Sequence, residues 1–386
     1  MRFEYETIGC IVLAFAWFVS KDTKIQNATI VGMIVCMIIY FFRCKSFVFR
    51  LNRIQTDGVN ELIVIESILN NHPFLFMLDT GYAGPPVISR SYLSIKLSKG
   101  SLESRYNDAM SKMTSVTTDD EFKAINNFIN KSECLPYTSG CTMKLMGIGQ
   151  IEEHQADLVM CPMLRMRNTM GVFMAPKKST QAYADMFVTN SLKNSIHILT
   201  CDYLLHHSPA MISFSHDCLE LNMSMTRYNL AKVGFTMLDA KFSGGSFVVD
   251  LFINNNALSF TVDTGSPTGI CVGQNAAHKV KTCNINGTQK SVRQGGINGE
   301  VVCSDIVESE VTFCGSKYIV PIFINNMATD FVDGYIGIGF LRGFDILMTH
   351  ETIGFAKNNV PIQTYSHYTK YATEGNCGKD LACLKS

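Results

Sequence analysis

Residues 64–81 read VIESILNNHPFLFMLDTG, and residues 248–265 read VVDLFINNNALSFTVDTG. The two segments align without a gap: an apolar pair, an acidic residue, an apolar run, Asn-Asn, a second apolar run and Asp-Thr-Gly follow in the same order. Asn-Asn between two extended apolar runs is typical of a turn, so each segment is predicted to form a β-hairpin. The repetition indicates that the chain contains a duplicated β-rich module.

Each copy places one carboxylate at the end of an apolar run, Asp79 in the first and Asp263 in the second. A carboxylate at the end of a buried strand is costly unless another group pairs with it or shares its charge. No basic residue lies close to Asp79 in the sequence. Two copies of one module are expected to pack about an approximate twofold axis, which brings equivalent residues together. Asp263 is therefore the predicted partner of Asp79.

The repeat continues downstream, where ILTCDYL at residues 198–204 closes the first half and YIGIGFL at residues 335–341 closes the second. The chain has 386 residues, 47% of them hydrophobic, and a formal net charge of +0. That length suits two domains or one large two-lobed unit. The balanced charge gives no reason to expect a nucleic-acid partner. The cysteines form no CxxC pair, so a zinc site is not indicated.

On the two Asp-Thr-Gly triplets in gapless repeat context and the two later apolar strands, the sequence resembles the pepsin and retropepsin superfamily of aspartic proteases. The resemblance covers roughly residues 60–360 and is to the single-chain, two-lobed form. It implies an all-β fold of two pseudo-symmetric β-barrel lobes, at residues 56–230 with Asp79 and at residues 231–365 with Asp263. Residues 1–55 are predicted to be a hydrophobic membrane-anchor region, and residues 366–386 a polar tail.

The same resemblance implies an endopeptidase in which Asp79 and Asp263 share one proton and activate a water molecule. Two carboxyl groups this close cannot both ionise, so one accepts a proton from the water and the other protonates the peptide carbonyl. The substrate would be a polypeptide, and neither a metal nor an organic cofactor would be needed. Supporting roles fall on Thr80 and Thr264, whose hydroxyls hydrogen-bond across the lobe interface in this family.

The remaining residues of the two loops have predicted roles as well. Gly81 and Gly265 let the backbone approach the carboxylates, and Ser266 is expected to hydrogen-bond Asp263 and favour its charged form. Tyr82 stands where the family usually has Ser, Thr or Ala, which predicts an asymmetric pair.

A second departure is Thr200, which occupies the position that Gly337 has in the second half. A side chain there needs extra room beside the first Asp-Thr-Gly loop. These two departures leave an alternative open, a catalytically inactive protein of the same fold that binds peptides or acts as a scaffold.

Other segments carry weaker expectations. Residues 135–141, LPYTSGC, resemble the flap that covers the cleft in pepsin-type enzymes, which makes Tyr137 the candidate flap residue. The GGING segment at residues 295–299 is expected in the corresponding hairpin of the second lobe. Residues 99–132 are interpreted as an insertion, helical at residues 119–129. The pair at residues 206–207, two histidines, is interpreted as the end of a strand and not as a metal site.

Two apolar stretches at residues 8–20 and 28–42 open the chain, each shorter than the roughly 20 residues that span a bilayer. They are interpreted as a membrane anchor, either a helical hairpin or one signal-anchor, although two buried helices would also fit. Arg43, Lys45, Arg50 and Arg53 follow the second stretch, which places the lobes on the cytosolic side. Glycosylation triplets beginning at residues 130, 222 and 286 leave a lumenal topology open.

Overall fold

The computed structural model describes part of the chain and leaves out the N-terminal 45 residues. The described residues are 46–55, 61–69, 72–82, 84–89, 135–146, 151–162, 164–174, 183–189, 197–222, 234–243, 246–281, 290–295, 301–325 and 332–372. Nearly all of them belong to one compact unit, Val48–Leu221 with Met225–Ser386. The insertion predicted at residues 99–132, including its helix, lies outside the described residues.

The two halves of the repeat fold as hairpins with the same register. The first hairpin consists of β2 (Glu61–Leu69) and β3 (His72–Asp79), and the second of β15 (Ser246–Ile253) and β16 (Asn256–Val262). Val64 pairs with Met77, and the aligned Val248 pairs with Thr261. Asn254 and Asn255 have positive φ angles of 48° and 68°, which a tight two-residue hairpin turn requires and which asparagine tolerates. The predicted hairpins are therefore present.

The first half continues with strands in a sheet whose path runs β2-β3-β10-β4-β9-β6-β5, with β7 beside β2 and β8 beside β7. Their bounds are β4 (Val87–Ser89), β5 (Leu135–Met146), β6 (Ile151–Pro162), β7 (Arg165–Arg167), β8 (Phe173–Met174), β9 (Tyr183–Thr189) and β10 (His197–Thr200). Strands β3 and β10 are parallel neighbours in the middle of this path.

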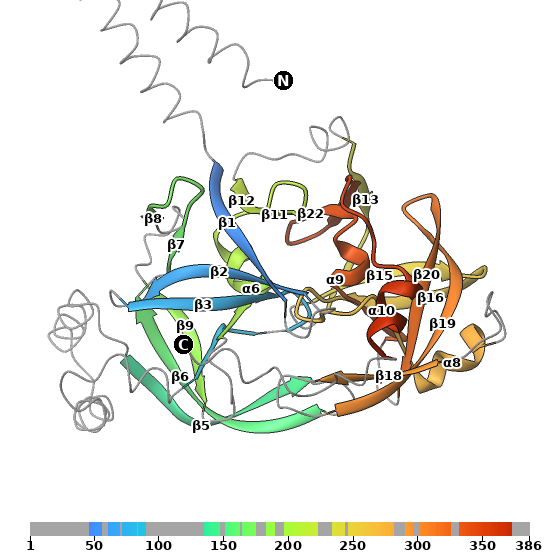
Figure 1. Cartoon of the computed structure of the whole chain (residues 1–386). Helices are drawn as coiled ribbons and strands as arrows, with labels where there is room; N and C mark the ends of the chain where they lie inside the picture. Colours follow the sequence, from blue (N-terminus) through green and yellow to red (C-terminus); the bar gives the residue numbers. More distant parts are fainter. Residues whose placement is uncertain are drawn as a thin grey trace, which may run out of the picture. The chain divides into compact units, whose positions relative to one another are not determined.

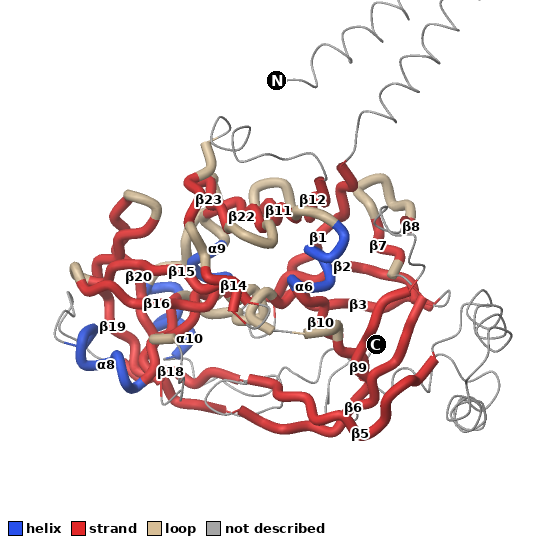
Figure 2. Tube along the Cα trace, turned by 180° about the vertical axis from the view of Figure 1, so that it is seen from behind, coloured by secondary structure: helices blue, strands red, loops and turns tan. Residues whose placement is uncertain are grey.

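The second half repeats that path as β15-β16-β21-β17-β20-β19-β18, with β14 beside β15. Their bounds are β14 (Lys241–Ser243), β17 (Ile270–Gly273), β18 (Lys290–Gly295), β19 (Val301–Phe313), β20 (Ser316–Asn325) and β21 (Gly334–Ile336). Strands β16 and β21 are parallel, like β3 and β10. An additional pairing between β15 and β19 closes the second path into a barrel. The all-β, duplicated architecture follows from this matched strand order (Figures 1 and 2).

Strands from both halves share one sheet, in the order β13-β23-β22-β11-β12-β1, which continues into β2. Their bounds are β1 (Ser46–Gln55), β11 (Ala210–Ser213), β12 (Cys218–Asn222), β13 (Thr236–Leu238), β22 (Phe344–Met348) and β23 (Ile353–Lys357). The link between the halves is the antiparallel pair β11–β22. Figure 1 shows these strands together above the two lobes.

The predicted segment limits differ from the structure at both ends. Residues 46–55 were assigned to the anchor region, but they form β1, whose Phe49 and Leu51 are buried and which pairs with β2. Residues 366–386 were assigned to a polar tail, but α10 (Tyr365–Ala372) begins there and Tyr368 packs on Phe323. In β1 the alternate residues Phe49 and Leu51 pack against the adjoining lobe, and in α10 the side chain of Tyr368 does so.

Three further helices are short: α6 (Cys201–His207), α8 (Gln274–Lys281) and α9 (Ile338–Leu341). The histidine pair at residues 206–207 thus ends a helix, so the expected strand end there is wrong. No helix within the described part of the chain is long and apolar enough to cross a membrane. The apolar stretches on which the anchor prediction depends lie outside that part.

Candidate active site

The two Asp-Thr-Gly segments follow equivalent strands and meet between the halves. Asp79 is the last residue of β3 and lies opposite Thr200 of the parallel strand β10. Asp263 directly follows β16, and its amide donates to the carbonyl of Ile336 at the end of β21. Each aspartate therefore lies where a hairpin strand and its parallel neighbour end together. Backbone hydrogen bonds join the two strands at that point.

The threonines after each aspartate exchange hydrogen bonds between the two loops. The Thr80 amide donates to Oγ1 of Thr264 at 3.2 Å, and the Thr264 amide donates to Oγ1 of Thr80 at 3.0 Å. Each hydroxyl then donates to a carbonyl of the opposite half, Thr80 to Val262 at 2.8 Å and Thr264 to Leu78 at 2.7 Å. Both threonines are fully buried. These reciprocal bonds satisfy every donor involved and fix the loops at one separation.

The glycines allow each loop to pass against the opposite carboxylate. A Cβ atom added to Gly81 would lie 2.5 Å from Cγ of Asp263, and one added to Gly265 would lie 2.5 Å from Cγ of Asp79. Real side chains do not approach so closely, so any other residue would displace a carboxyl group. The glycines are needed here for close approach, as the sequence predicted.

The structure brings the carboxyl groups of Asp79 and Asp263 within hydrogen-bonding distance of each other. Each also accepts two backbone amides on its Oδ1 atom. Asp79 accepts from Gly81 and Tyr82 at 2.9 Å, and Asp263 accepts from Gly265 at 2.8 Å and from Ser266 at 3.1 Å. One oxygen of each carboxylate is thus held by its own loop in nearly the same way.

Burial raises the pKa of both carboxyl groups, but to different degrees. For Asp79, desolvation raises the pKa, and hydrogen bonds from the Tyr82 and Gly81 amides and from Asp263 oppose that shift. For Asp263, desolvation and then the charge of Asp79 raise the pKa well above the usual 3.8. Because like charges this close cannot both ionise, the pair is expected to hold one proton between its two carboxyl groups.

The hydrogen bond predicted from the Ser266 hydroxyl to Asp263 is absent from the structure. The Ser266 hydroxyl hydrogen-bonds Oγ1 of Thr268 at 3.0 Å, so only its backbone amide reaches Asp263. Tyr82 supplies the equivalent amide to Asp79, and its buried ring packs in the core of the first lobe. The expected difference in local donors is therefore absent, because backbone amides and not hydroxyls hold both carboxylates.

The loop beside Asp79 accommodates Thr200 by giving its hydroxyl a role. Thr200 is the N-cap of α6, and its Oγ1 accepts a hydrogen bond from the Tyr203 amide at 3.3 Å. Gly337 is the N-cap of α9 without such a bond, and a Cβ atom there would lie 2.3 Å from the Thr268 carbonyl oxygen. In the second half, backbone atoms fill the space beside Gly337. In the first half the corresponding space holds the Thr200 side chain, which caps α6.

The predicted flap has a backbone counterpart. Tyr137 lies in β5, which forms a long hairpin with β6 and has an irregular register between Pro136 and Cys141. The Tyr137 side chain is outside the described residues, so its prediction stays untested. The second half has the equivalent hairpin β18–β19, and most of the GGING segment lies in its undescribed turn. No cluster of His, Cys, Asp or Glu that would suit a metal ion occurs in the described residues.

Sequence reasoning missed a link between the halves beside the site. The hydroxyl of Ser246 donates to the carbonyl of Gly81 at 2.7 Å and is buried. Ser246 aligns with Leu62 of the first repeat, so no equivalent bond exists on the other side. A polar residue in an apolar position of the repeat was the available signal.

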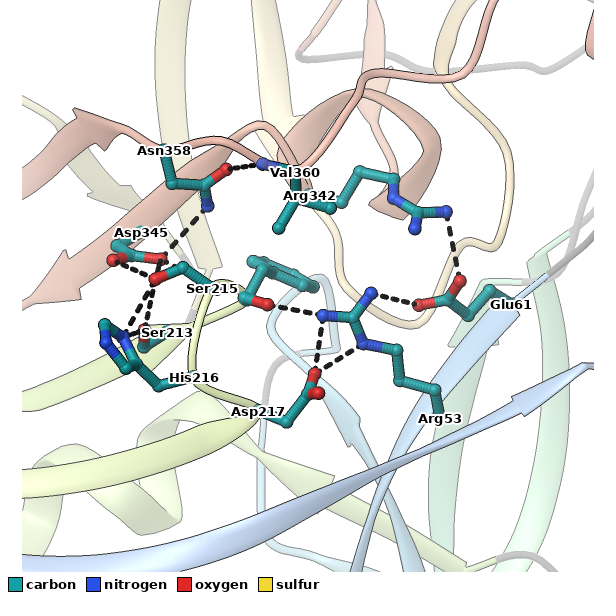
Figure 3. Close-up of polar contacts among 11 residues, drawn as sticks. Arg53, Glu61, Ser213, Ser215, His216, Asp217, Arg342, Asp345, Asn358 and Val360 are labelled. Carbon is teal, nitrogen blue, oxygen red and sulfur yellow. Dashed lines mark hydrogen bonds and ion pairs between the residues drawn. The ribbon is translucent and has the colours of Figure 1, made fainter.

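A buried ionic cluster also joins the halves, as Figure 3 shows. The Glu61 carboxylate accepts from Arg342 at 3.0 Å and lies 3.5 Å from a nitrogen of Arg53. Arg53 in turn binds Asp217 and the Phe214 carbonyl of the β11–β12 turn. Arg342 directly follows α9, so the cluster ties the segment after Gly337 to the start of β2. The cluster lies outside the repeat, so no repeated pattern predicted it.

Comparisons with known proteins add a likeness in fold. No protein-family model matches the chain, and no curated protein matches it. Among solved structures, conglutin gamma from lupine seeds has 11% identity and a TM-score of 0.48, with 81% of this chain and 95% of that chain covered. Basic 7S globulin from soybean has 10% identity, the same coverage and a TM-score of 0.47. Aspartic proteinase from Irpex lacteus has 12% identity and a TM-score of 0.39, covering 83% and 99%. Each TM-score is below one half, so the chemical argument depends on the site geometry alone.

Proposed function

We propose that this protein is an aspartic endopeptidase that hydrolyses peptide bonds with a water molecule activated by Asp79 and Asp263. The observation that supports the proposal is the pair of hydrogen-bonded carboxyl groups, one of which has a strongly raised pKa. Such a pair holds one proton between two acids and can both accept and donate a proton at the same centre. Its titration belongs to the pair as a whole.

The shared proton gives the two carboxyl groups different tasks. The charged carboxyl group accepts a proton from the attacking water, and the protonated one donates its proton to the carbonyl oxygen of the scissile bond. The resulting diol collapses when its C–N bond breaks and the nitrogen takes up a proton. The amides of the two loops hold one oxygen of each carboxyl group, which leaves the facing oxygens for the water and the substrate.

The substrate of this reaction is an extended polypeptide that binds as an added strand. The long hairpins β5–β6 and β18–β19 occupy equivalent places in the two halves and are the elements that would cover it. Tyr137 of the first hairpin remains the proposed flap residue. No metal or organic cofactor takes part in the proposed mechanism.

Cleavage of a mixed peptide library by the purified protein, measured across a range of pH, tests the proposal. Asp79→Asn and Asp263→Asn should each lower the rate by about 100-fold to 10,000-fold, the usual contribution of a general acid or base. Asp250→Asn is the matched control, because Asp250 is an exposed carboxylate of the same hairpin and should leave the rate unchanged. Peptide binding without any cleavage would instead support the inactive, peptide-binding alternative.

We also propose that the apolar N-terminal stretches tether the protein to a membrane with its lobes on the cytosolic side. The basis is their sequence and the basic residues that follow them. Carbonate extraction of membranes followed by protease treatment of sealed vesicles tests this. Release into the supernatant would contradict the tether, and protection of the lobes inside vesicles of lumenal orientation would contradict the cytosolic side.

A further inference from the structure

The β7–β8 hairpin presents two apolar side chains to solvent. Met170 is 78% exposed and Val172 is 57% exposed, although both are side chains that usually gain from burial. Phe173–Met174 follows as β8, so the two residues form the tip between the strands. A single exposed apolar residue is common on protein surfaces, whereas apolar residues exposed together indicate a contact surface.

The shape of this tip does not depend on its apolar side chains. Asn168 is buried, and its Oδ1 atom accepts hydrogen bonds from the amides of Met170 at 3.0 Å and Val172 at 2.8 Å. Gly171 has a φ angle of 83°, and its amide donates to the Asn168 carbonyl at 3.0 Å. The backbone is thus held by Asn168 and Gly171, which leaves the side chains of Met170 and Val172 free for another purpose.

The tip lies against the start of β1. The Thr169 amide donates to the Val48 carbonyl at 3.3 Å, and Phe49 forms an isolated bridge with Asn168. Figures 1 and 2 show β7, β8 and the start of β1 along one edge of the unit, on the side away from β5 and β18. The chain therefore enters the described unit at the edge that carries the exposed tip.

A hollow of about 510 Å³ opens beside the tip, and it is lined by Arg50, Leu51, Asn52, Arg53, Thr169, His216 and Asp217. Arg53 is engaged with Asp217 and Glu61. None of the described residues forms an ion pair with Arg50, which is exposed. The Asp217 carboxylate in this lining is paired with Arg53, so a negatively charged group would find the Arg50 guanidinium without an ion-pair partner among the described residues, with neutral donors beside it.

We propose that this face, the β7–β8 tip with Arg50 and the adjoining hollow, docks on an anionic bilayer surface. The apolar segment at residues 28–42 is followed by Arg43 and Lys45 and then directly by β1, so a tether of this sequence delivers the face to the membrane. Met170 and Val172 would enter the interfacial region, and Arg50 would bind a lipid phosphate. The inference rests on the proposed tether. It places the hairpins β5–β6 and β18–β19 away from the membrane, where substrates can reach them.

Tryptophan fluorescence in proteoliposomes of the full-length protein tests the docking. The chain has a single tryptophan, Trp17, so Trp17→Phe gives a background in which Met170→Trp reports on the tip alone. In vesicles that contain phosphatidylserine, brominated acyl chains should quench most of the emission of this reporter. Phe252→Trp is the matched control, because Phe252 is 48% exposed on β15 of the other lobe and should remain unquenched.

Arg50→Ala in the reporter background should lower the docked fraction about fivefold, the effect of one basic residue near an anionic surface. Equal quenching of the Met170→Trp reporter and the Phe252→Trp control would overturn the proposal. Quenching of the Met170→Trp reporter that does not change after Arg50→Ala would also overturn it. Blue-shifted emission of the tip reporter in detergent, together with no quenching by brominated lipid in vesicles, would show that a protein covers the tip. That result would also overturn the proposal. Asp263→Asn should abolish cleavage without changing the quenching, which separates this proposal from that of the activity.

Discussion

His197 is expected to make the first lobe sensitive to acid. It begins β10, it has no exposed surface, and its ring lies 5.1 Å from that of Phe74 and 5.5 Å from that of Phe76. Its Nδ1 atom accepts a hydrogen bond from the Ser89 amide at 3.2 Å, which requires the neutral ring. Burial lowers the pKa of His197 from 6.5 to about 4.

The sign of the effect follows from comparing the folded and unfolded states. Above pH 6.5, His197 is neutral in both states and its titration has no effect on stability. As the pH falls through 6.5, the unfolded chain binds a proton that the folded chain does not bind until about pH 4. The free energy of unfolding therefore falls by roughly 1.4 kcal/mol per pH unit, or about 3 kcal/mol in total.

The substitution His197→Asn removes this titration and keeps an acceptor for the Ser89 amide. Hydrogen exchange of the β3 and β10 amides, followed by mass spectrometry between pH 7 and pH 4, measures local stability without assuming that both lobes unfold together. The variant should lose less protection on acidification than the parent protein, whatever its stability at neutral pH. Both proteins contain the Asp79–Asp263 pair, so its opposite contribution cancels in the comparison. An identical pH dependence in the two proteins would refute the reasoning.

Three further substitutions test the contacts between the halves. Gly265→Ala should abolish peptide cleavage, because its Cβ atom would lie 2.5 Å from the carboxyl carbon of Asp79. Gly269→Ala is the control and should remain active, because the atom nearest to its Cβ would lie 3.7 Å away. A peptide-cleavage assay of both variants measures the difference. Thr264→Val should lower the free energy of unfolding by about 1–3 kcal/mol in calorimetry, because it leaves the Thr80 amide without its acceptor; Thr264→Ser should not. Arg342→Met should lower the free energy of unfolding in urea by about 1–3 kcal/mol, since the buried Glu61 carboxylate loses its hydrogen-bonded partner and keeps only the ion pair with Arg53. Lys317→Met, which breaks an exposed pair, should cost about 1 kcal/mol or less, and equal losses would contradict this account.

The parts of the fold that could be predicted are those set by local patterns repeated in the sequence. The alternation of apolar residues and the Asn-Asn turns determine both hairpins and their register, since a shift by one residue would turn every side chain to the other face. The aligned triplets then place Asp79 beside Asp263, because equivalent residues meet at an approximate twofold axis. The reciprocal bonds of Thr80 and Thr264 follow from the same symmetry together with the family resemblance.

The orientation of single hydroxyl groups could not be predicted. The Ser266 hydroxyl shares a hydrogen bond with the Thr268 hydroxyl, and only the Ser266 amide bonds the Asp263 carboxylate. Thr200 was interpreted as an obstacle, but a hydroxyl at a helix start is also a cap.

Contacts between segments without a repeat counterpart were also beyond prediction. Arg342 lies 281 positions from Glu61, and nothing in the local sequence of either residue indicates that they meet. The same holds for β22 and β23, which lie in the second half of the sequence but pair in the sheet of the first. Charge pairs and sheet partners of this kind are selected by the final packing of the whole chain.

The sheet shared by the two halves has a consequence during synthesis on the ribosome. Its inner strand β11 leaves the ribosome well before β22, its neighbour on one side, and Arg342 emerges long after Glu61. A nascent chain that has produced the first lobe therefore still exposes an open sheet edge and a Glu61 carboxylate that lacks Arg342. Holdase chaperones would find both on that intermediate, and the acids that face each other in the finished molecule cannot act until translation is nearly complete.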